Sequence, residues 1–120
     1  KNQVNKYSPI SRLKAPSPIA LKQLNDRGVA LLTWEDRTTD ETGFKVYRCK
    51  DSFYVNDTAT YQDCQFKLVA TTAANVTKLR LPRPNDLNNN DSHYKYKITA
   101  IRGQEESIPD GLIDIYLDIP

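Results

Sequence analysis

The chain has 120 residues, of which 17 are Lys or Arg and 15 are Asp or Glu, so its formal net charge is +2. This length supports one domain with a single hydrophobic core. The basic residues are scattered among acidic ones, whereas a nucleic-acid-binding domain usually gathers them on one face. We therefore expect no nucleic-acid partner. No apolar run reaches the length of a membrane-spanning helix, so we also expect no membrane insertion.

The first part of the chain carries no regular pattern. Residues 1–14 show neither the alternation of a strand nor the period of a helix, and Pro16 and Pro18 follow them. We interpret residues 1–14 as an N-terminal arm or linker and residues 15–120 as the domain. The first six residues lack the apolar core of a signal peptide, so we expect a leader that has been removed or a chain taken from a longer protein.

A strand pattern begins at Ile19, where apolar and polar residues alternate. Ile19 and Leu21 predict a first strand, and a second is predicted at residues 29–34 after a polar turn. Trp34 closes the second strand. Because it has the largest side chain of the chain, we expect it to be the hub of the core.

Residues 44–49 predict a third strand, with Phe44 and Val46 on the face that meets the core. Cys49 has the opposite parity, so we expect it to lie away from the core. The chain then becomes polar from residue 50 to residue 65 and loses any sustained period. These residues predict a long loop.

The chain contains two cysteines, Cys49 and Cys64, one at each end of this loop. An even number of cysteines in a small domain favours a disulfide and an oxidising compartment, and two unrelated thiols are the alternative. The disulfide would close this segment into a projecting loop that carries Tyr54 and Tyr61, which makes them candidate contact residues. It also predicts an extracellular or cell-surface location.

The clearest strand covers residues 94–100. Tyr94, Tyr96 and Ile98 alternate there with polar residues, which gives one apolar and one polar face. Further strands are predicted at residues 66–70, 76–81 and 112–119, and residues 82–91 form an irregular crossing. Seven short strands with turns between them and no helix predict an all-β fold, a seven-stranded antiparallel sandwich of immunoglobulin-like type.

No pattern in the sequence indicates catalysis or a bound metal. The only histidine, His93, has no partner at a catalytic spacing, so we expect it to be structural or solvated. Four carboxylates gather in one loop, and oxygen ligands of this kind bind calcium. They lack a known calcium-loop spacing, so a solvated acidic loop is the favoured interpretation. The four residues are Glu35, Asp36, Asp40 and Glu41. We expect a protein that is not an enzyme and has no cofactor or metal.

Several segments together resemble a fibronectin type III domain. They are Leu-Thr-Trp at residues 32–34, Thr-Gly-Phe-Lys-Val-Tyr-Arg at 42–48, Phe-Lys-Leu-Val-Ala at 66–70 and the alternating strand at 94–100. The resemblance covers residues 15–120 and is greatest to modules in secreted or surface proteins of microbes. It implies the fibronectin type III topology. The segment between Cys49 and Cys64 and the crossing, counted here from Pro82 to His93, are longer than the family pattern.

The resemblance also implies two residue roles. Trp34 would be the tryptophan of the family core. Tyr94 would be the tyrosine whose hydroxyl ties the crossing to the sheet, with Leu87 as its apolar companion. The chain has no Arg-Gly-Asp sequence, so integrin binding is not implied.

Three functions remain open, because such folds host unrelated tasks. The first is a non-catalytic extracellular module, acting as a spacer or as an adhesion or protein-interaction domain beside flanking domains. The second is a subunit of an extracellular homopolymer, a filament or pilus-like assembly joined through the arm or through strand edges. The third is a carbohydrate-binding module that uses Tyr54, Tyr61 or Tyr116.

Overall fold

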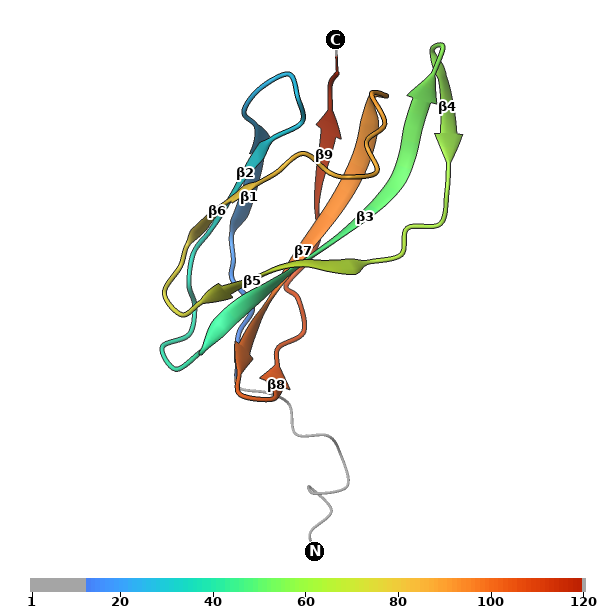
Figure 1. Cartoon of the computed structure of the whole chain (residues 1–120). Coiled ribbons are helices and arrows are strands. Elements are labelled where there is room, and N and C mark those ends of the chain that lie inside the picture. Colours follow the sequence, from blue (N-terminus) through green and yellow to red (C-terminus); the bar gives the residue numbers. More distant parts are fainter. Residues whose placement is uncertain (1–12, 120) are drawn as a thin grey trace, which may run out of the picture.

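A computed structural model describes residues 13–119, and these residues form two packed antiparallel β-sheets (Figure 1). One sheet has the order β1-β2-β6. The other has the order β4-β3-β7-β8, with β5 also paired to β3 and β9 also paired to β7. The strands are β1 (Ile19–Gln23), β2 (Ala30–Trp34), β3 (Gly43–Val55), β4 (Thr58–Tyr61), β5 (Lys67–Ala73), β6 (Lys78–Leu81), β7 (Ser92–Arg102), β8 (Glu105–Glu106) and β9 (Ile113–Leu117). The predicted all-β sandwich is confirmed.

Residues 13–119 contain no helix long and apolar enough to span a membrane.

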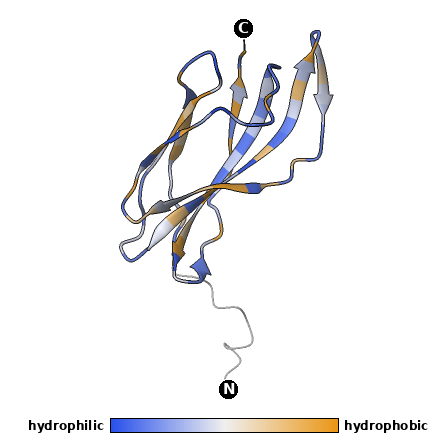
Figure 2. Cartoon of the chain, viewed as in Figure 1, coloured by the Kyte–Doolittle hydropathy of each residue, from blue (hydrophilic) through white to orange (hydrophobic). Residues whose placement is uncertain are grey.

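The core lies between the two sheets and is built by alternation along the strands. Successive side chains of a strand point to opposite faces, and Figure 2 shows hydrophobic and hydrophilic residues following one another along β3. Trp34 on β2 meets Phe44 on β3 edge to face, with ring centroids 5.5 Å apart, which joins the sheets. The residues that the sequence placed in the core all lie in this buried cluster: Trp34, Phe44, Val46, Tyr94, Tyr96 and Ile98.

The described part of the chain has nine strands, where the sequence predicted seven. The seven are present, and β4 and β8 are additional. The prediction of a long loop at residues 50–65 was wrong, because β3 continues to Val55 and turns back into β4. Asn56 and Asp57 form the turn, with φ of 50° and 65°. Asn and Asp adopt such left-handed conformations more readily than most residues, so this dipeptide makes a two-residue hairpin turn.

The crossing between β6 and β7 is fastened by Tyr94. Its hydroxyl donates a hydrogen bond to Asp86 Oδ1 at 2.8 Å. Leu87, the next residue of the crossing, is fully buried in the core. Burial and the neighbouring Asp86 carboxylate raise the pKa of the Tyr94 hydroxyl, so it stays a donor at neutral pH. This contact is the one that the resemblance implied.

The N-terminal boundary falls at the edge of the described residues. Of the predicted arm, only Leu13 and Lys14 are described, and the rest lies outside residues 13–119. Leu13 is 4% exposed and belongs to the core cluster. Its burial fastens this end of the chain to the sandwich.

Gly43 should tolerate no side chain, because β5 approaches β3 very closely there. A Cβ at Gly43 would lie 2.1 Å from the backbone oxygen of Thr72. We expect Gly43→Ala to lower the free energy of unfolding by about 1–3 kcal/mol, since the strands must separate. Gly111→Ala is the control, because no atom lies within 4 Å of its added Cβ. Equal denaturant midpoints for the two variants would contradict this account.

Removing the Tyr94 hydroxyl should weaken the crossing. We expect Tyr94→Phe to cost about 0.5–1.5 kcal/mol in urea unfolding, the usual contribution of one hydrogen bond. Tyr116→Phe is the matched control, since the Tyr116 hydroxyl also donates to a carboxylate but this residue is 47% exposed. The control should change the midpoint less. If Tyr94→Phe has the smaller effect, the hydroxyl does not hold the crossing.

Candidate functional site

The outer face of the larger sheet, at the end where β3 and β4 form a hairpin, carries a row of aromatic side chains. Directly paired residues of antiparallel strands share a face. Tyr61 on β4 pairs with Ser52 on β3, Ser52 pairs with His93 on β7, and His93 pairs with Tyr116 on β9. Tyr54 lies two residues beyond Ser52 and so shares this face. We call Tyr54, Tyr61 and Tyr116 the tyrosine patch.

All three side chains of the tyrosine patch are open to solvent. Tyr61 is 79% exposed, and the other two are half-exposed. The Tyr54 and Tyr116 rings meet edge to face, with centroids 6.0 Å apart and planes at 84°. The structure therefore brings together two residues that lie far apart in the sequence. Because the planes of these two rings are perpendicular, they do not form one flat surface.

Asp91, at the end of the crossing, holds the patch in place. Its backbone oxygen accepts from the Tyr54 amide at 2.9 Å, and its carboxylate accepts from the Tyr116 hydroxyl at 2.9 Å. The same carboxylate accepts from the Ile119 amide at 2.6 Å. Partial burial and the bond to Asp91 raise the pKa of Tyr116 to about 12. Sequence reasoning missed Asp91, since nothing in its position marked it as a partner of two tyrosines.

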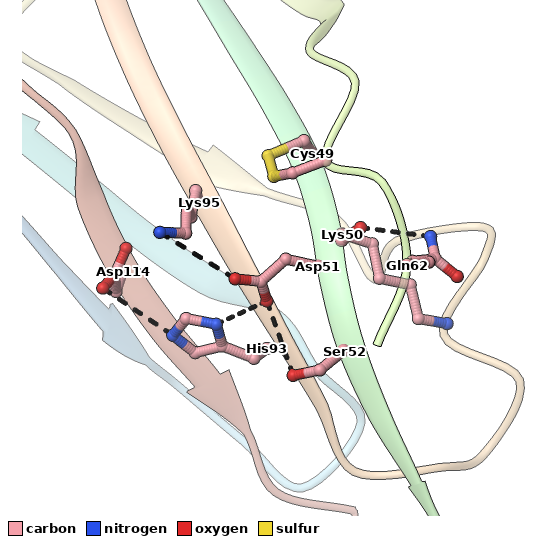
Figure 3. Close-up of a disulfide and its surroundings, with 9 residues drawn as sticks. Cys49, Lys50, Asp51, Ser52, Gln62, His93, Lys95 and Asp114 are labelled. Carbon is pink, nitrogen blue, oxygen red and sulfur yellow. Dashed lines mark hydrogen bonds and ion pairs between the residues drawn. A yellow bond between two sulfur atoms is a disulfide. The ribbon is translucent and has the colours of Figure 1, made fainter. Parts of the chain in front are cut away.

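A disulfide joins Cys49 on β3 to Cys64, which follows β4, with their Cα atoms 5.0 Å apart (Figure 3). Both cysteines are thus bonded, and the alternative of two free thiols does not hold. Cys49 pairs with Lys95 on the face opposite the core, as predicted. It is nevertheless only 3% exposed, because the returning segment with Cys64 covers it. The bridge closes the hairpin at its base.

Hydrogen bonds beside the disulfide continue this closure. The Gln62 amide donates to the Asp51 backbone oxygen at 3.0 Å, and the Gln62 side chain donates to the Lys50 backbone oxygen at 3.1 Å. The β3–β7 register shifts between Lys50 and Ser52, so a bulge forms there. Bulges bend a strand and increase its twist. Together these features set the direction in which the hairpin projects.

His93 connects β7 to the strands on either side (Figure 3). Its Nδ1 lies 2.6 Å from Asp51 Oδ1, and its Nε2 lies 3.8 Å from Asp114 Oδ2. The ammonium group of Lys95 lies 3.9 Å from the other Asp51 oxygen. These four residues connect β3, β7 and β9 on the face that carries the tyrosine patch. Through these contacts His93 has a structural role, one of the two alternatives expected from the sequence.

The rest of this outer face is polar and paired within the chain. The Glu106 carboxylate accepts a hydrogen bond from the Tyr47 hydroxyl and lies 3.9 Å from the Lys45 ammonium group. Burial and Glu106 raise the pKa of Tyr47 to about 12. Lys97 lies over the Phe66 and Tyr47 rings, at 4.4 and 5.4 Å from their centroids. The patch is therefore the part of this face that offers exposed aromatic surface.

A polar cleft of about 530 Å³ lies on the other side of the disulfide, between β5 and the crossing. Lys50 is 8% exposed there, and its ammonium group donates to the Asp86 backbone oxygen. Burial lowers the pKa of Lys50, and the Asp86 carboxylate opposes this shift. Arg48 covers the Tyr94 ring at 5.5 Å. Lys50 thus fastens the crossing to the sheet, while Arg48 packs on a side chain of the sheet itself.

The acidic loop is only partly solvated, so that expectation was wrong for Glu41. This residue is 6% exposed, and its Oε2 accepts from the Asn75 amide at 3.1 Å. The Asp40 carboxylate forms an ion pair with the Arg102 guanidinium group. Residues 13–119 contain no group of three or more His, Cys, Asp or Glu side chains placed to hold a metal ion.

Removing the disulfide should destabilise the domain. The two cysteines are 15 residues apart in the sequence. Cross-linking a loop of that size restricts the unfolded chain by on the order of 3 kcal/mol. We expect the double variant Cys49→Ser, Cys64→Ser to lose about that much in guanidinium unfolding. A reductant should lower the midpoint of the unaltered protein and leave that of the double variant unchanged. An unaltered protein that is insensitive to reductant would contradict the assignment.

The sequence matches no family model, and no curated protein matches it. Solved structures do match its fold. The third fibronectin III domain of the human KIAA0343 protein matches over 90% of this chain and 84% of its own, at 15% identity and a TM-score of 0.67. The chicken CNTN1 FN1-FN3 domains match over 88% of this chain and 31% of theirs, at 12% identity and a TM-score of 0.64.

A redesigned β-sandwich protein matches over 90% of this chain and 93% of its own, at 19% identity and a TM-score of 0.62. At such identities the similarity shows the fold alone. None of these similarities supports the microbial part of the expected resemblance, which stays an expectation. The chain shares with these domains a sandwich of antiparallel sheets. The chain has the fibronectin type III fold.

Proposed function

We propose that this domain is a non-catalytic module of an extracellular or surface protein and that it binds a partner protein through the tyrosine patch. The observation that carries this proposal is the exposure of three aromatic side chains on one rigid face. Tyrosine is enriched where proteins bind one another, because it has large apolar area, a polar tip and few rotatable bonds. An exposed cluster of this kind marks a contact site more often than isolated apolar residues do.

Order within the hairpin supports a role in recognition. The disulfide and the Gln62 hydrogen bonds fix the base of the hairpin, and Asp91 fixes Tyr54 and Tyr116. A site that is already ordered loses less conformational entropy on binding than a flexible loop would. The stapled hairpin therefore suits a recognition element better than a simple spacer.

The location also belongs to the proposal. A structural disulfide persists in oxidising surroundings such as the cell exterior and is rare in the cytosol. Fibronectin type III domains occur among flanking domains, as in the chicken structure with FN1-FN3 in its name. We therefore place this domain in a secreted or surface-exposed protein with neighbouring domains.

Site-specific photo-crosslinking tests the proposed contact. A photoreactive phenylalanine at position 61 should form a covalent adduct with a protein on cells that produce this chain. The control position is 108, because Ile108 is 84% exposed and lies outside the patch. It should form no adduct with the same protein. The captured partner is then tested for binding to purified variants.

Tyr61→Ala should weaken binding to the captured partner by about 30-fold, the effect of losing about 2 kcal/mol at an interface hot spot. Ile108→Ala should leave the affinity unchanged. If position 108 captures the same protein, or if Tyr61→Ala binds as tightly as the unaltered chain, the contact does not lie at the tyrosine patch.

A further inference from the structure

The edges of the two sheets differ in how they are protected from pairing with another strand. An unpaired edge accepts a foreign strand unless charge, proline, a bulge or a neighbour blocks it. β1 and β9 lie side by side, and the Gln23 side chain bonds both backbone groups of Asp118. β6 carries Lys78 and Arg80 and is followed at once by Pro82. These edges are therefore protected.

β4 has only four residues and β8 consists of two glutamates, and short or charged edge strands pair poorly with a foreign strand. β5 is the longer edge with little protection among residues 13–119, and it pairs with β3 alone (Figure 1). Its sequence is Lys-Leu-Val-Ala-Thr-Thr-Ala, and the lysine at its start is the one charged residue. Figure 2 shows this hydrophilic start followed by hydrophobic colours. The register shifts opposite Val46 and Tyr47, so Val69 has no direct partner. This bulge interrupts the first half and leaves residues 70–73 as a regular, uncharged edge.

The close approach of Thr72 to Gly43 shows which N–H and C=O groups of residues 70–73 point to β3 and which point to the open edge. The carbonyl oxygen of Thr72 points to β3, since a Cβ on Gly43 would lie 2.1 Å from it. Neighbouring residues of an antiparallel strand direct their backbone groups alternately to the two sides. Thr71 and Ala73 therefore direct their N–H and C=O groups away from β3, toward the open edge. The backbone oxygen of Ala73 also accepts a hydrogen bond from the Thr72 hydroxyl at 3.2 Å. Its second lone pair can still accept a hydrogen bond from another strand.

We propose that the β5 edge pairs with the β5 edge of a second copy of this chain, antiparallel and around a two-fold axis at Thr72. Thr71 of each copy then faces Ala73 of the other, and each such pair exchanges two backbone hydrogen bonds. The larger sheet continues through both copies. An isologous contact of this kind closes at two subunits, in contrast to an open filament.

Charge favours a second copy as the occupant. With the two-fold axis at Thr72, the facing residues of the two copies are all alanine or threonine. No like charges therefore meet across the paired edges. Lys67 lies beyond the paired residues. The formal net charge is only +2, so repulsion between two copies is weak. Leu68, which is 51% exposed, would gain cover beside the new strand.

Sedimentation velocity over a concentration series tests the pairing, with Thr71→Pro as the main variant. Proline removes the outward N–H of Thr71 and leaves the hydrogen bonds that Thr72 makes to β3. We expect the unaltered chain to shift from monomer to dimer as its concentration rises, and Thr71→Pro to raise the dissociation constant at least tenfold. Thr71→Lys, which adds like charges near the axis, should act in the same direction. Unfolding midpoints check that both variants fold.

Thr60→Lys is the matched control, because Thr60 is exposed on β4, the neighbouring edge strand. It should dimerise as the unaltered chain does, and so should Tyr61→Ala, which alters the tyrosine patch alone. The proposal is overturned if the unaltered chain stays monomeric to about 1 mM. It is equally overturned if assemblies grow beyond the dimer, if both Thr71 variants dimerise normally, or if Thr60→Lys abolishes the dimer.

Discussion

The burial of alternate side chains along β7 determines how the rest of the chain is arranged. Tyr94, Tyr96 and Ile98 are each at most 1% exposed, so β7 must be covered by a second sheet along its length. Its own sheet satisfies its backbone groups through β3 on one side and β9 on the other. Two polar side chains at the start of β7 make contacts outside the core. His93 cross-links the outer face, and the Tyr94 hydroxyl holds the crossing.

The pairing of β3 with β4 and β5 explains where the two proposed contact surfaces lie. β3 is longer than the core beneath it, so its last residues extend past the sandwich and need their own partner. β4 supplies the pairing, and the disulfide closes the base. At the opposite end of the same edge, β5 approaches Gly43 closely with the Thr72 oxygen directed to β3, so alternation along the strand directs the backbone groups of Thr71 outward. One edge of the sheet thus carries two different surfaces, an aromatic one made by side chains and a backbone one made by β5.

Alternation made most of the fold predictable from the sequence. Residues 94–100 and 44–46 have unbroken periods, and the strands expected there exist with the expected inward faces. The hairpin was not predicted, because the bulge between Lys50 and Ser52 breaks the period that marks a strand. The signal that could have found it is the turn pair Asn56 and Asp57 between two β-forming segments. Asp91 and Glu41 were missed because their partners are distant in the sequence.

The candidate site was predicted less completely than the fold. The cysteine pair could be inferred from count and position, and Tyr54 and Tyr61 from their place between the cysteines. Their common face with Tyr116 depends on the register of β3, β7 and β9, and one residue of slip would reverse it. Register is fixed by the bulge and the turn, which the sequence pattern does not reveal.

The central claim is that residues 50–62 form an ordered hairpin continuous with the core sheet. Amide hydrogen exchange followed residue by residue tests it most directly. The account predicts slow exchange at the Tyr54 amide, which donates to Asp91, and at the Gln62 amide, which donates to Asp51. Protection at both should fall on reduction of the disulfide while β7 stays protected. Exchange at both amides as fast as in an unfolded peptide, with the disulfide intact, would contradict the account.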